Sequence, residues 1–284
     1  MIMMKPASLV AGQQAELERL LGEIPKARTS ALLLDYDGTL APFAVERHLA
    51  SPYPGVTRLL QAIMSTGRTR VVMITGRSVP DVVPLLAMNP LPEIWGAHGL
   101  QRMRPDGTCE TPRLEEGTVQ ALSEADEWLI GQNLRNLAEH KPGGIAVHWR
   151  GLPEAAAMEI REQVLRGWFQ IAQSRFLSVL EFDGGVEIRV PSLDKGDVVR
   201  AIVHEMDPAA PVAYLGDDTT DERAFKALGT RGLTILVRPE PRRTSAQMWF
   251  KPPEDLLDFL ARWLQACREK TLSQDGDAWR RRSQ

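Results

Sequence analysis

The sequence lacks the features that mark secreted, membrane-spanning and nucleic-acid-binding proteins. It has only two cysteines in 284 residues, Cys109 and Cys267, and their wide separation favours reduced thiols over a disulfide framework. No apolar run approaches the roughly 20 residues that a membrane-spanning helix needs. The formal net charge is −3, so the chain has no basic excess of the kind that contacts nucleic acid. We therefore expect no nucleic-acid partner and no membrane insertion.

The start of the chain also lacks the pattern of a secretory signal. Residues 1–6, Met-Ile-Met-Met-Lys-Pro, contain no basic stretch followed by a long apolar segment. We expect a cytoplasmic protein with one large domain or two small ones.

Short apolar runs alternate with helical patterns at both ends of the chain. Buried strands are predicted at residues 31–34, 70–74, 93–96, 212–215 and 233–237. The predicted helices between and after them are 54–64, 194–205, a helix from 222, and 255–267. Strand, helix and strand at this spacing are typical of a parallel α/β unit.

The middle of the chain has a different pattern of predicted helices and strands. Two long helical patterns, 115–137 and 153–173, are followed by strand-like stretches at 144–149 and 177–182, and 186–190 alternates as a half-buried strand does. This pattern predicts an α+β module inserted into an α/β domain. The expected division is 1–104 for the first part of the core, 105–190 for the inserted module and 191–284 for the second part of the core.

Two carboxylates follow the first predicted strand. Asp35 and Asp37 come directly after the run 31–34, so Asp35 should lie at a strand's carboxyl end, where parallel sheets place their ligands. One carboxylate can attack an electrophile or hold a cation while the other transfers a proton. Gly38 permits a sharp turn after them. The alternative is an ordinary Asx-rich turn.

Two other positions carry groups suited to phosphoryl transfer. Thr75 follows the strand 70–74, and its hydroxyl can bond a phosphate oxygen, unless it is only a helix cap or turn residue. Lys195 lies at a helix start, where the macrodipole is already positive. A nearby anion would explain it, and a solvent-facing lysine is the alternative.

An acidic loop follows the strand 212–215. Three aspartates and a glutamate within residues 217–222 repel one another unless a cation or solvent separates them. Mg²⁺ prefers a few carboxylate oxygens while it retains waters and substrate phosphate. An acidic helix start explains Asp221 and Glu222. It explains Asp217 and Asp218 less well, so we expect a magnesium site here.

Together these loops resemble the four motifs of the haloacid dehalogenase-like phosphatase superfamily. Those motifs are Asp-x-Asp-Gly-Thr, Ser/Thr, Lys and Gly-Asp-Asp-x-x-x-Asp, and they occur here in that order. The sequence is further similar to the trehalose-6-phosphate phosphatase family. The segments that carry this similarity are 35–40, 75–77, 96–99, 146–150, 186–189 and 216–222. The resemblance implies an α/β fold, a Rossmann-like parallel-sheet core with an inserted α+β cap between the Thr and Lys motifs.

The resemblance also implies a reaction, the Mg²⁺-dependent hydrolysis of trehalose 6-phosphate. Asp35 would attack phosphorus, and Asp37 would act as acid and then base. The implied metal ligands are Asp35, the Asp37 carbonyl and Asp217, and Lys195 and Thr75 complete the phosphate site. Asp218 and Asp221 would orient metal-bound water or Lys195.

The resemblance assigns the sugar to the cap. Glu139, Lys141 and Glu187 match the family's disaccharide-binding positions. Arg77 and His98 are grouped with them beside the substrate, with His98 shaping the loop near the hinge between core and cap. Read without the resemblance, Glu139 and Lys141 form the solvated end of a helix, and Glu187 is the exposed face of an alternating strand.

Other functions stay open on the sequence. Phosphatases for sucrose phosphate or mannosyl-phosphoglycerate share the core motifs, and a phosphomutase is disfavoured by the cap residues. A non-catalytic sugar-phosphate sensor, or a partner of a trehalose-phosphate synthase, is the alternative outside enzymes. The presence of Asp35, Asp37 and Lys195 favours an enzyme.

Overall fold

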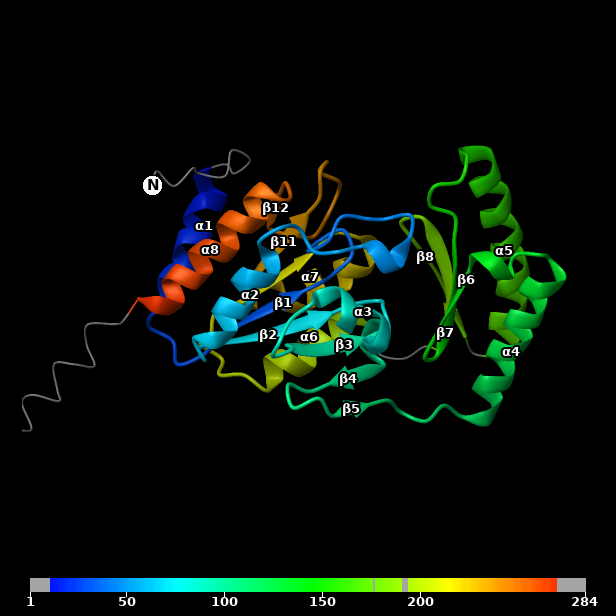
Figure 1. Cartoon of the computed structure of the whole chain (residues 1–284), viewed down its shortest axis with the longest axis horizontal. Coiled ribbons are helices and arrows are strands. Elements are labelled where there is room, and N and C mark those ends of the chain that lie inside the picture. Colours follow the sequence, from blue (N-terminus) through cyan, green and yellow to red (C-terminus); the bar gives the residue numbers. More distant parts are fainter. Residues whose placement is uncertain (1–10, 176, 191–193, 270–284) are drawn as a thin grey trace, which may run out of the picture.

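An eight-stranded sheet forms the core of the molecule. The computed structural model describes residues 11–175, 177–190 and 194–269, and its two sheets lie in separate parts of the structure (Figure 1). The larger sheet has the order β12-β11-β10-β1-β2-β3-β4-β5, in which β4 and β5 are antiparallel to their neighbours and the other pairs are parallel. Its strands are β1 (Ser30–Leu34), β2 (Thr69–Ile74), β3 (Glu93–Gly96), β4 (Gln101–Met103), β5 (Cys109–Glu110), β10 (Val212–Gly216), β11 (Leu233–Val237) and β12 (Met248–Phe250).

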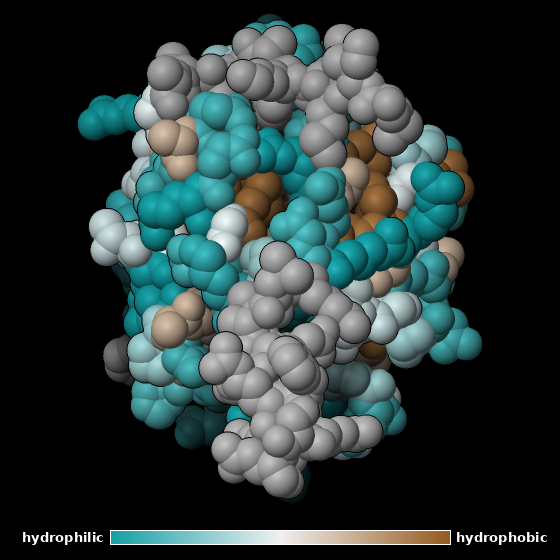
Figure 2. All heavy atoms as spheres, turned by 90° about the vertical axis from the view of Figure 1, so that its left-hand side faces the viewer, coloured by the Kyte–Doolittle hydropathy of each residue, from teal (hydrophilic) through white to brown (hydrophobic). Residues whose placement is uncertain are grey.

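Helices cover both faces of this sheet. The helices are α1 (Ala11–Glu23), α2 (Val56–Ser65), α3 (Val79–Leu86) and α8 (Glu254–Arg268) on one face, and α6 (Lys195–His204) and α7 (Glu222–Leu228) on the other. Alternate residues of β1 serve the two faces, because Leu32 and Leu34 pack in the first layer and Ala31 and Leu33 in the second. The end of the core that carries α1 and α8 is mostly hydrophilic on its outer surface (Figure 2).

A second, four-stranded antiparallel sheet belongs to the inserted segment, which we call the cap. Its order is β6-β7-β9-β8, with β6 (Ala138–Lys141), β7 (Gly144–His148), β8 (Ser178–Phe182) and β9 (Gly185–Arg189). The helices α4 (Glu116–Gly131) and α5 (Glu154–Arg175) pack on one face of this sheet. There Ile145 and Ile188 meet the fully buried Trp168 of α5 in one apolar cluster. The opposite face of the sheet turns towards the core (Figure 1).

The predicted fold class is confirmed, and one detail of the prediction is wrong. The helix expected at 115–137 ends at Gly131, a left-handed residue follows at Asn133 (φ 59°), and β6 begins at Ala138. The expected start of the cap at residue 105 stays a prediction, and β5, which follows that position, pairs with β4 in the core sheet. We propose that the cap begins after Glu110 and ends at Val190.

Several short elements had no clear sequence signal. The helix α3 contains Pro84 in its interior, where proline ordinarily breaks a helix, whereas Pro80 lies in the first turn, which tolerates proline. Ser78 caps the start of the helix by accepting the backbone N–H of Asp81. Five 3₁₀ turns also occur among the described residues, at Arg47–Leu49, Ala97–Gly99, Arg135–Leu137, Thr219–Asp221 and Gly229–Arg231. The outer ends of the expected core segments, 1–10 and 270–284, and residues 191–193 lie outside the described residues.

Both cysteines are free thiols, with Cys109 exposed and Cys267 buried. Within the described ranges, none of the helices combines the length and apolar character that crossing a bilayer requires.

Replacing Trp168 tests the packing of the cap. Trp168→Ala removes a fully buried ring, so we expect it to lower the free energy of unfolding by about 3–5 kcal/mol. The neighbouring Phe169 is half exposed on the same helix, and Phe169→Ala should change stability by less than about 0.5 kcal/mol. Urea denaturation followed by circular dichroism measures both, and equal losses would contradict this packing.

Candidate active site

Three adjacent strands of the core sheet end at one place and deliver polar side chains to it. Asp35 follows β1, Thr75 follows β2 and Asp217 follows β10, and β1 pairs in parallel with both of the others. The backbone N–H of Asp35 donates to the carbonyl of Leu215 at 2.9 Å, which fixes the two acidic loops against each other. The loops after β1, β2 and β10 therefore lie together at the carboxyl edge of the sheet.

Lys195 lies buried between two carboxylates. Its Nζ donates to Oδ1 of Asp35 at 2.6 Å and to Oδ1 of Asp221 at 2.8 Å, and only 3% of the residue is exposed. The solvent-facing alternative for Lys195 is therefore wrong. The Tyr214 hydroxyl donates to the same oxygen of Asp221 at 2.6 Å. The other oxygen of Asp221 accepts the backbone N–H groups of Asp217 and Asp218, at 3.1 and 3.0 Å.

The acidic residues offer a place for a metal ion. Asp35, Asp217 and Asp221 are buried, and one ligand atom from each lies within 4.8 Å of the others. Oδ2 of Asp217 is buried and has no hydrogen-bond partner among the described residues. A Cβ at Gly38, whose φ is +80°, would lie 2.2 Å from this oxygen, so glycine keeps the space beside it free. Hard carboxylate oxygens of this kind fit a divalent cation.

Burial and mutual repulsion shift the pKa values in this cluster. Burial raises the pKa of Asp35 to about 7, against the opposing charge of Lys195. Burial and the charges of Asp35 and Asp221 raise the pKa of Asp217 well above its usual range. Burial alone would lower the pKa of Lys195, but the adjacent Asp221 and Asp35 raise it above its ordinary value. A bound cation would relieve the repulsion among the carboxylates.

Asp37 points to a partner that the sequence did not predict. Its two oxygens accept the Nε and Nη2 donors of Arg77 at 2.7 and 2.6 Å, and the Arg77 side chain is almost wholly buried. The Asp37 carboxylate is therefore not part of the acidic cluster. Arg77 pairs with this carboxylate and also lines the pocket, as Asp37 does. Thr75 is buried, and its hydroxyl accepts the backbone N–H of Arg77 at 3.1 Å.

Three charged residues of the cap share one face of its sheet. The register pairs Glu139 with Ala146 and Ala146 with Glu187, so both carboxylates lie in one cross-strand row with a small residue between them. Nζ of Lys141 lies 3.6 Å from Glu139 and 3.4 Å from Glu187. All three side chains are at most 15% exposed. The readings of Glu139 and Lys141 as a solvated helix end, and of Glu187 as exposed, are therefore wrong.

His98 joins the core to this cap face. Its Nε2 lies 3.1 Å from Oε2 of Glu187, and its backbone N–H donates to the carbonyl of Thr75 at 2.9 Å. Ala97 and His98 both have positive φ, 49° and 56°, an uncommon conformation for residues with a side chain. A Cβ at Gly76 would lie 2.7 Å from the His98 ring, so glycine is required where the two loops touch.

The cap carboxylates are held in their ionised forms. Burial raises the pKa of Glu187, but Lys141, His98 and Arg189 together hold it well below its usual range. Burial lowers the pKa of His98, against the attraction of Glu187, so the imidazole is neutral at pH 7. An ionised carboxylate accepts hydrogen bonds only, which suits a ligand rich in hydroxyl groups.

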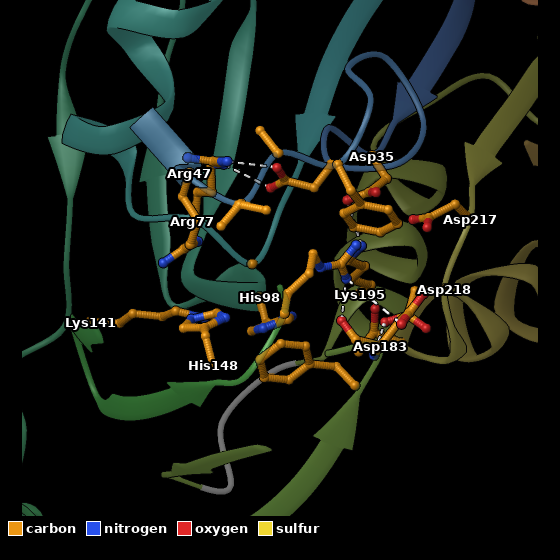
Figure 3. A pocket seen from close by; sticks show the side chains of 18 residues that line it. Asp35, Arg47, Arg77, His98, Lys141, His148, Asp183, Lys195, Asp217 and Asp218 are labelled. Atoms are coloured by element: carbon orange, nitrogen blue, oxygen red, sulfur yellow. Dashed lines mark hydrogen bonds and ion pairs between the residues drawn. The ribbon is translucent and has the colours of Figure 1, made fainter. Parts of the chain in front are cut away.

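One pocket connects the core cluster to the cap. Asp35, Lys195 and Asp217 line it from the core, and Lys141 and His148 line it from the cap. Figure 3 shows Lys141 and His148 at one end and the carboxylates of the core at the other. Asp218 also lines the pocket, and one of its carboxylate oxygens accepts the backbone N–H of Asp183 in the cap at 3.1 Å.

Sequence reasoning missed several residues of this pocket and its surroundings, namely Arg47, His148, Arg150, Asp183 and Tyr214. His148 and Arg150 belong to a motif that the sequence singled out, and the strand alternation after Glu139 and Lys141 could have placed His148 on their face. Tyr214 lies inside an apolar strand, and Arg47 in a loop, where no local signal distinguishes them.

Comparison with known proteins agrees with this geometry. Residues 33–254 match the trehalose-phosphatase family. The chain is 31% identical over 246 residues to the trehalose-phosphate phosphatase of Mycobacterium marinum, an alignment that covers 82% of this chain and 60% of the relative. It is 30% identical over 265 residues to that of Mycobacterium tuberculosis, covering 87% and 64%. The chain thus spans about three fifths of the length of the curated relatives it matches.

Solved structures show the same fold. The C-terminal domain of Candida albicans trehalose-6-phosphate phosphatase matches with a TM-score of 0.76 at 17% identity, covering 92% of this chain and 99% of that one. A haloacid dehalogenase-like hydrolase from Bacillus subtilis matches with a TM-score of 0.59 at 12% identity, covering 82% and 99%. Because the family match extends over most of the sequence, the chain belongs to the trehalose-phosphatase family.

Proposed function

We propose that this protein hydrolyses trehalose 6-phosphate to trehalose and inorganic phosphate. The observation that carries the proposal is the single pocket lined by Asp35 and Lys195 at one end and by Lys141 at the other. A phosphate at the core end would leave the attached sugar facing the cap. The family membership and the mycobacterial relatives support the same substrate.

Asp35 is the proposed nucleophile. One of its carboxylate oxygens attacks phosphorus while the bond from phosphorus to the sugar oxygen breaks, which leaves an aspartyl phosphate. Lys195 holds the Asp35 carboxylate in place through its 2.6 Å hydrogen bond and offsets charge on the phosphoryl oxygens. Water then attacks the aspartyl phosphate at phosphorus and regenerates Asp35.

Asp37 is the proposed acid and base. It gives a proton to the leaving sugar oxygen and then takes one from the attacking water. Both of its oxygens are bonded to Arg77 in this structure, so Asp37 must change partners before it can reach the sugar oxygen. We propose that Arg77 and Thr75, which are joined by a hydrogen bond, border the phosphate on this side.

We propose Mg²⁺ as the metal, held by Asp35, Asp217 and the Asp37 carbonyl. When bound, it supplies positive charge that stabilises the transferring phosphoryl group. Asp221 is proposed to orient Lys195, which it bonds at 2.8 Å, and Asp218 to orient water near the metal.

The sugar is proposed to bind Glu139, Lys141 and Glu187. Two carboxylates on either side of an alanine can each accept hydrogen bonds from sugar hydroxyl groups, and the Lys141 ammonium can donate hydrogen bonds to sugar oxygens. A site that satisfies many hydroxyl groups discriminates strongly against a ligand that lacks them. His98 is proposed to act on the sugar through Glu187, which it contacts. A cytoplasmic location and association with a trehalose-phosphate synthase stay predictions of the sequence.

A substrate panel tests the proposed reaction. We expect phosphate release in Mg²⁺ to be fastest with trehalose 6-phosphate, ahead of sucrose 6-phosphate, glucose 6-phosphate and mannosyl-phosphoglycerate. Asp35→Asn removes the nucleophile and should lower kcat by at least about a thousandfold. Asp106→Asn, in an exposed turn, is the matched control and should retain full activity. Preference for another glycosyl phosphate would overturn the proposed substrate, and an active Asp35→Asn variant would overturn the nucleophile.

Thermal unfolding tests the metal site without using activity. At a free Mg²⁺ concentration of about 100 times its Kd, binding should raise the free energy of unfolding by about 2.7 kcal/mol and raise Tm accordingly. EDTA should reverse the shift. Asp217→Asn removes one proposed ligand and should abolish most of the shift, whereas Asp106→Asn should keep it. An undiminished shift in Asp217→Asn would place the metal elsewhere.

Replacing Glu187 separates sugar recognition from chemistry. Glu187→Gln should lower kcat/KM for trehalose 6-phosphate by about a hundredfold, since it removes the proposed charged acceptor for the sugar and the partner of Lys141 and His98, which line the pocket. Turnover of p-nitrophenyl phosphate should stay within about threefold. Glu181→Gln is the control, because Glu181 is exposed and pairs with Arg161 on the cap surface. Equal losses on both substrates would make Glu187 a structural residue.

A further inference from the structure

A loop of the core crosses to the cap beside the pocket. Phe43, Ala44, Val45 and Arg47 of this loop line the pocket. The guanidinium of Arg150 lies 3.7 Å from the centroid of the Phe43 ring. A Cβ at Gly151 would lie 3.1 Å from Cγ1 of Val45. Phe43 and Val45 therefore lie against residues of the cap.

Arg47 makes the one contact of this series that reaches a proposed sugar-binding residue. Its guanidinium forms an ion pair with Oε2 of Glu139, and the two side chains are 29% and 15% exposed. The same oxygen is hydrogen-bonded to Nε2 of His148 at 2.9 Å and lies 3.6 Å from Nζ of Lys141. Of these three partners, Arg47 alone comes from the core. Glu139 is therefore held jointly by both parts of the chain.

The charge on Glu139 makes this contact strong. Burial raises its pKa, but the hydrogen bond from His148 and the charges of Lys141 and Arg47 bring the pKa to about 2. Glu139 is thus fully ionised at neutral pH, and its carboxylate forms an ion pair with Arg47 that is partly shielded from solvent. Such pairs contribute more than exposed ones, which solvent screens.

Other contacts between core and cap lie at the phosphate end of the pocket. There the backbone N–H of Asp183 donates to Asp218 at 3.1 Å, and the Asp183 carboxylate lies 3.5 Å from Arg238. These contacts lie beside the acidic loop, at the phosphate end of the pocket. They would therefore have the same effect on every phosphate ester, whatever group the ester carries. The contact of Arg47 lies at the sugar end, so it can distinguish esters that carry the disaccharide from those that do not.

We propose that Arg47 is a specificity-determining positioning residue, which joins the core to the cap through Glu139 and holds that carboxylate for the sugar. The proposal rests on the proposed function, because it assigns Glu139 to sugar binding. A small aryl phosphate does not reach Glu139, so its hydrolysis is independent of Arg47. Trehalose 6-phosphate needs Glu139 in position, so its KM depends on Arg47.

Steady-state kinetics of Arg47 variants test this role. Arg47→Gln should raise KM for trehalose 6-phosphate by about tenfold, the size expected for one charge-assisted contact. The kcat for trehalose 6-phosphate should stay within about twofold of the value for the unsubstituted protein. The kcat and KM for p-nitrophenyl phosphate should also stay within about twofold. Arg47→Lys should recover part of the loss. In a Glu139→Gln background, Arg47→Gln should have no added effect, because the two residues act together. Arg161→Gln is the control, since Arg161 pairs with Glu181 inside the cap.

Hydrogen exchange on the substrate-free protein gives a second readout. Arg47→Gln should speed amide exchange both in residues 43–50 and in β6, and Arg161→Gln should leave both segments unchanged. If trehalose 6-phosphate is not a substrate but exchange still accelerates in both segments, the contact between core and cap stands and the proposed function fails. If trehalose 6-phosphate is turned over and Arg47→Gln matches Arg161→Gln in KM and exchange, the proposal is overturned. An equal loss on both phosphate esters would also overturn it, because Arg47 would then be a general structural residue.

Discussion

The hydrogen bond between Lys195 and Asp35 is the interaction on which the rest of the structure depends. The two residues are 160 positions apart, on opposite sides of the inserted cap, and both are buried. A buried ammonium without an anionic partner is strongly unfavourable, so the first and second parts of the core must close on each other for Lys195 to be accommodated. Asp221 and Tyr214 extend the same network from the acidic loop and β10. The arrangement that holds the core together is thus also the proposed catalytic centre.

The core could be predicted from sequence because its signals are local. The run 31–34 and the residues directly after it specify a buried strand with Asp35 at its end, and the structure has both. The partner of Asp37 could not be predicted, because the bond to Arg77 depends on how the loops after β1 and β2 approach each other. The end of α4 was also misplaced, since apolar residues continue at helical spacing up to Leu137 while Asn133 adopts a left-handed conformation that stops the helix. Arg47 carries no signal at all, because its role comes from a contact between two parts of the chain.

The cap sheet carries charged side chains on one face and apolar side chains on the other. Its other side is anchored by an apolar cluster around Trp168, so the pleat alone sends Glu139 and Glu187 towards the core. Lys141 of the cap and Arg47 of the core supply positive charge that keeps those carboxylates ionised, and the His98 side chain of the core contacts Glu187. Ligand recognition in this arrangement needs both parts of the chain, although each sheet is built without the other.

The large sheet ends in very short strands, and this bears on how the protein behaves when it is concentrated. One edge is β5, which has two residues, both exposed, and the other is β12, which has three residues, none of them exposed. An edge strand with a long row of unpaired N–H and C=O groups can pair with an edge of another molecule and start aggregation. Edges of two and three residues offer too few groups for such pairing. The large sheet therefore has little edge through which to grow. The longer open edges of the molecule belong to the cap sheet, whose outer strands β6 and β8 have four and five residues.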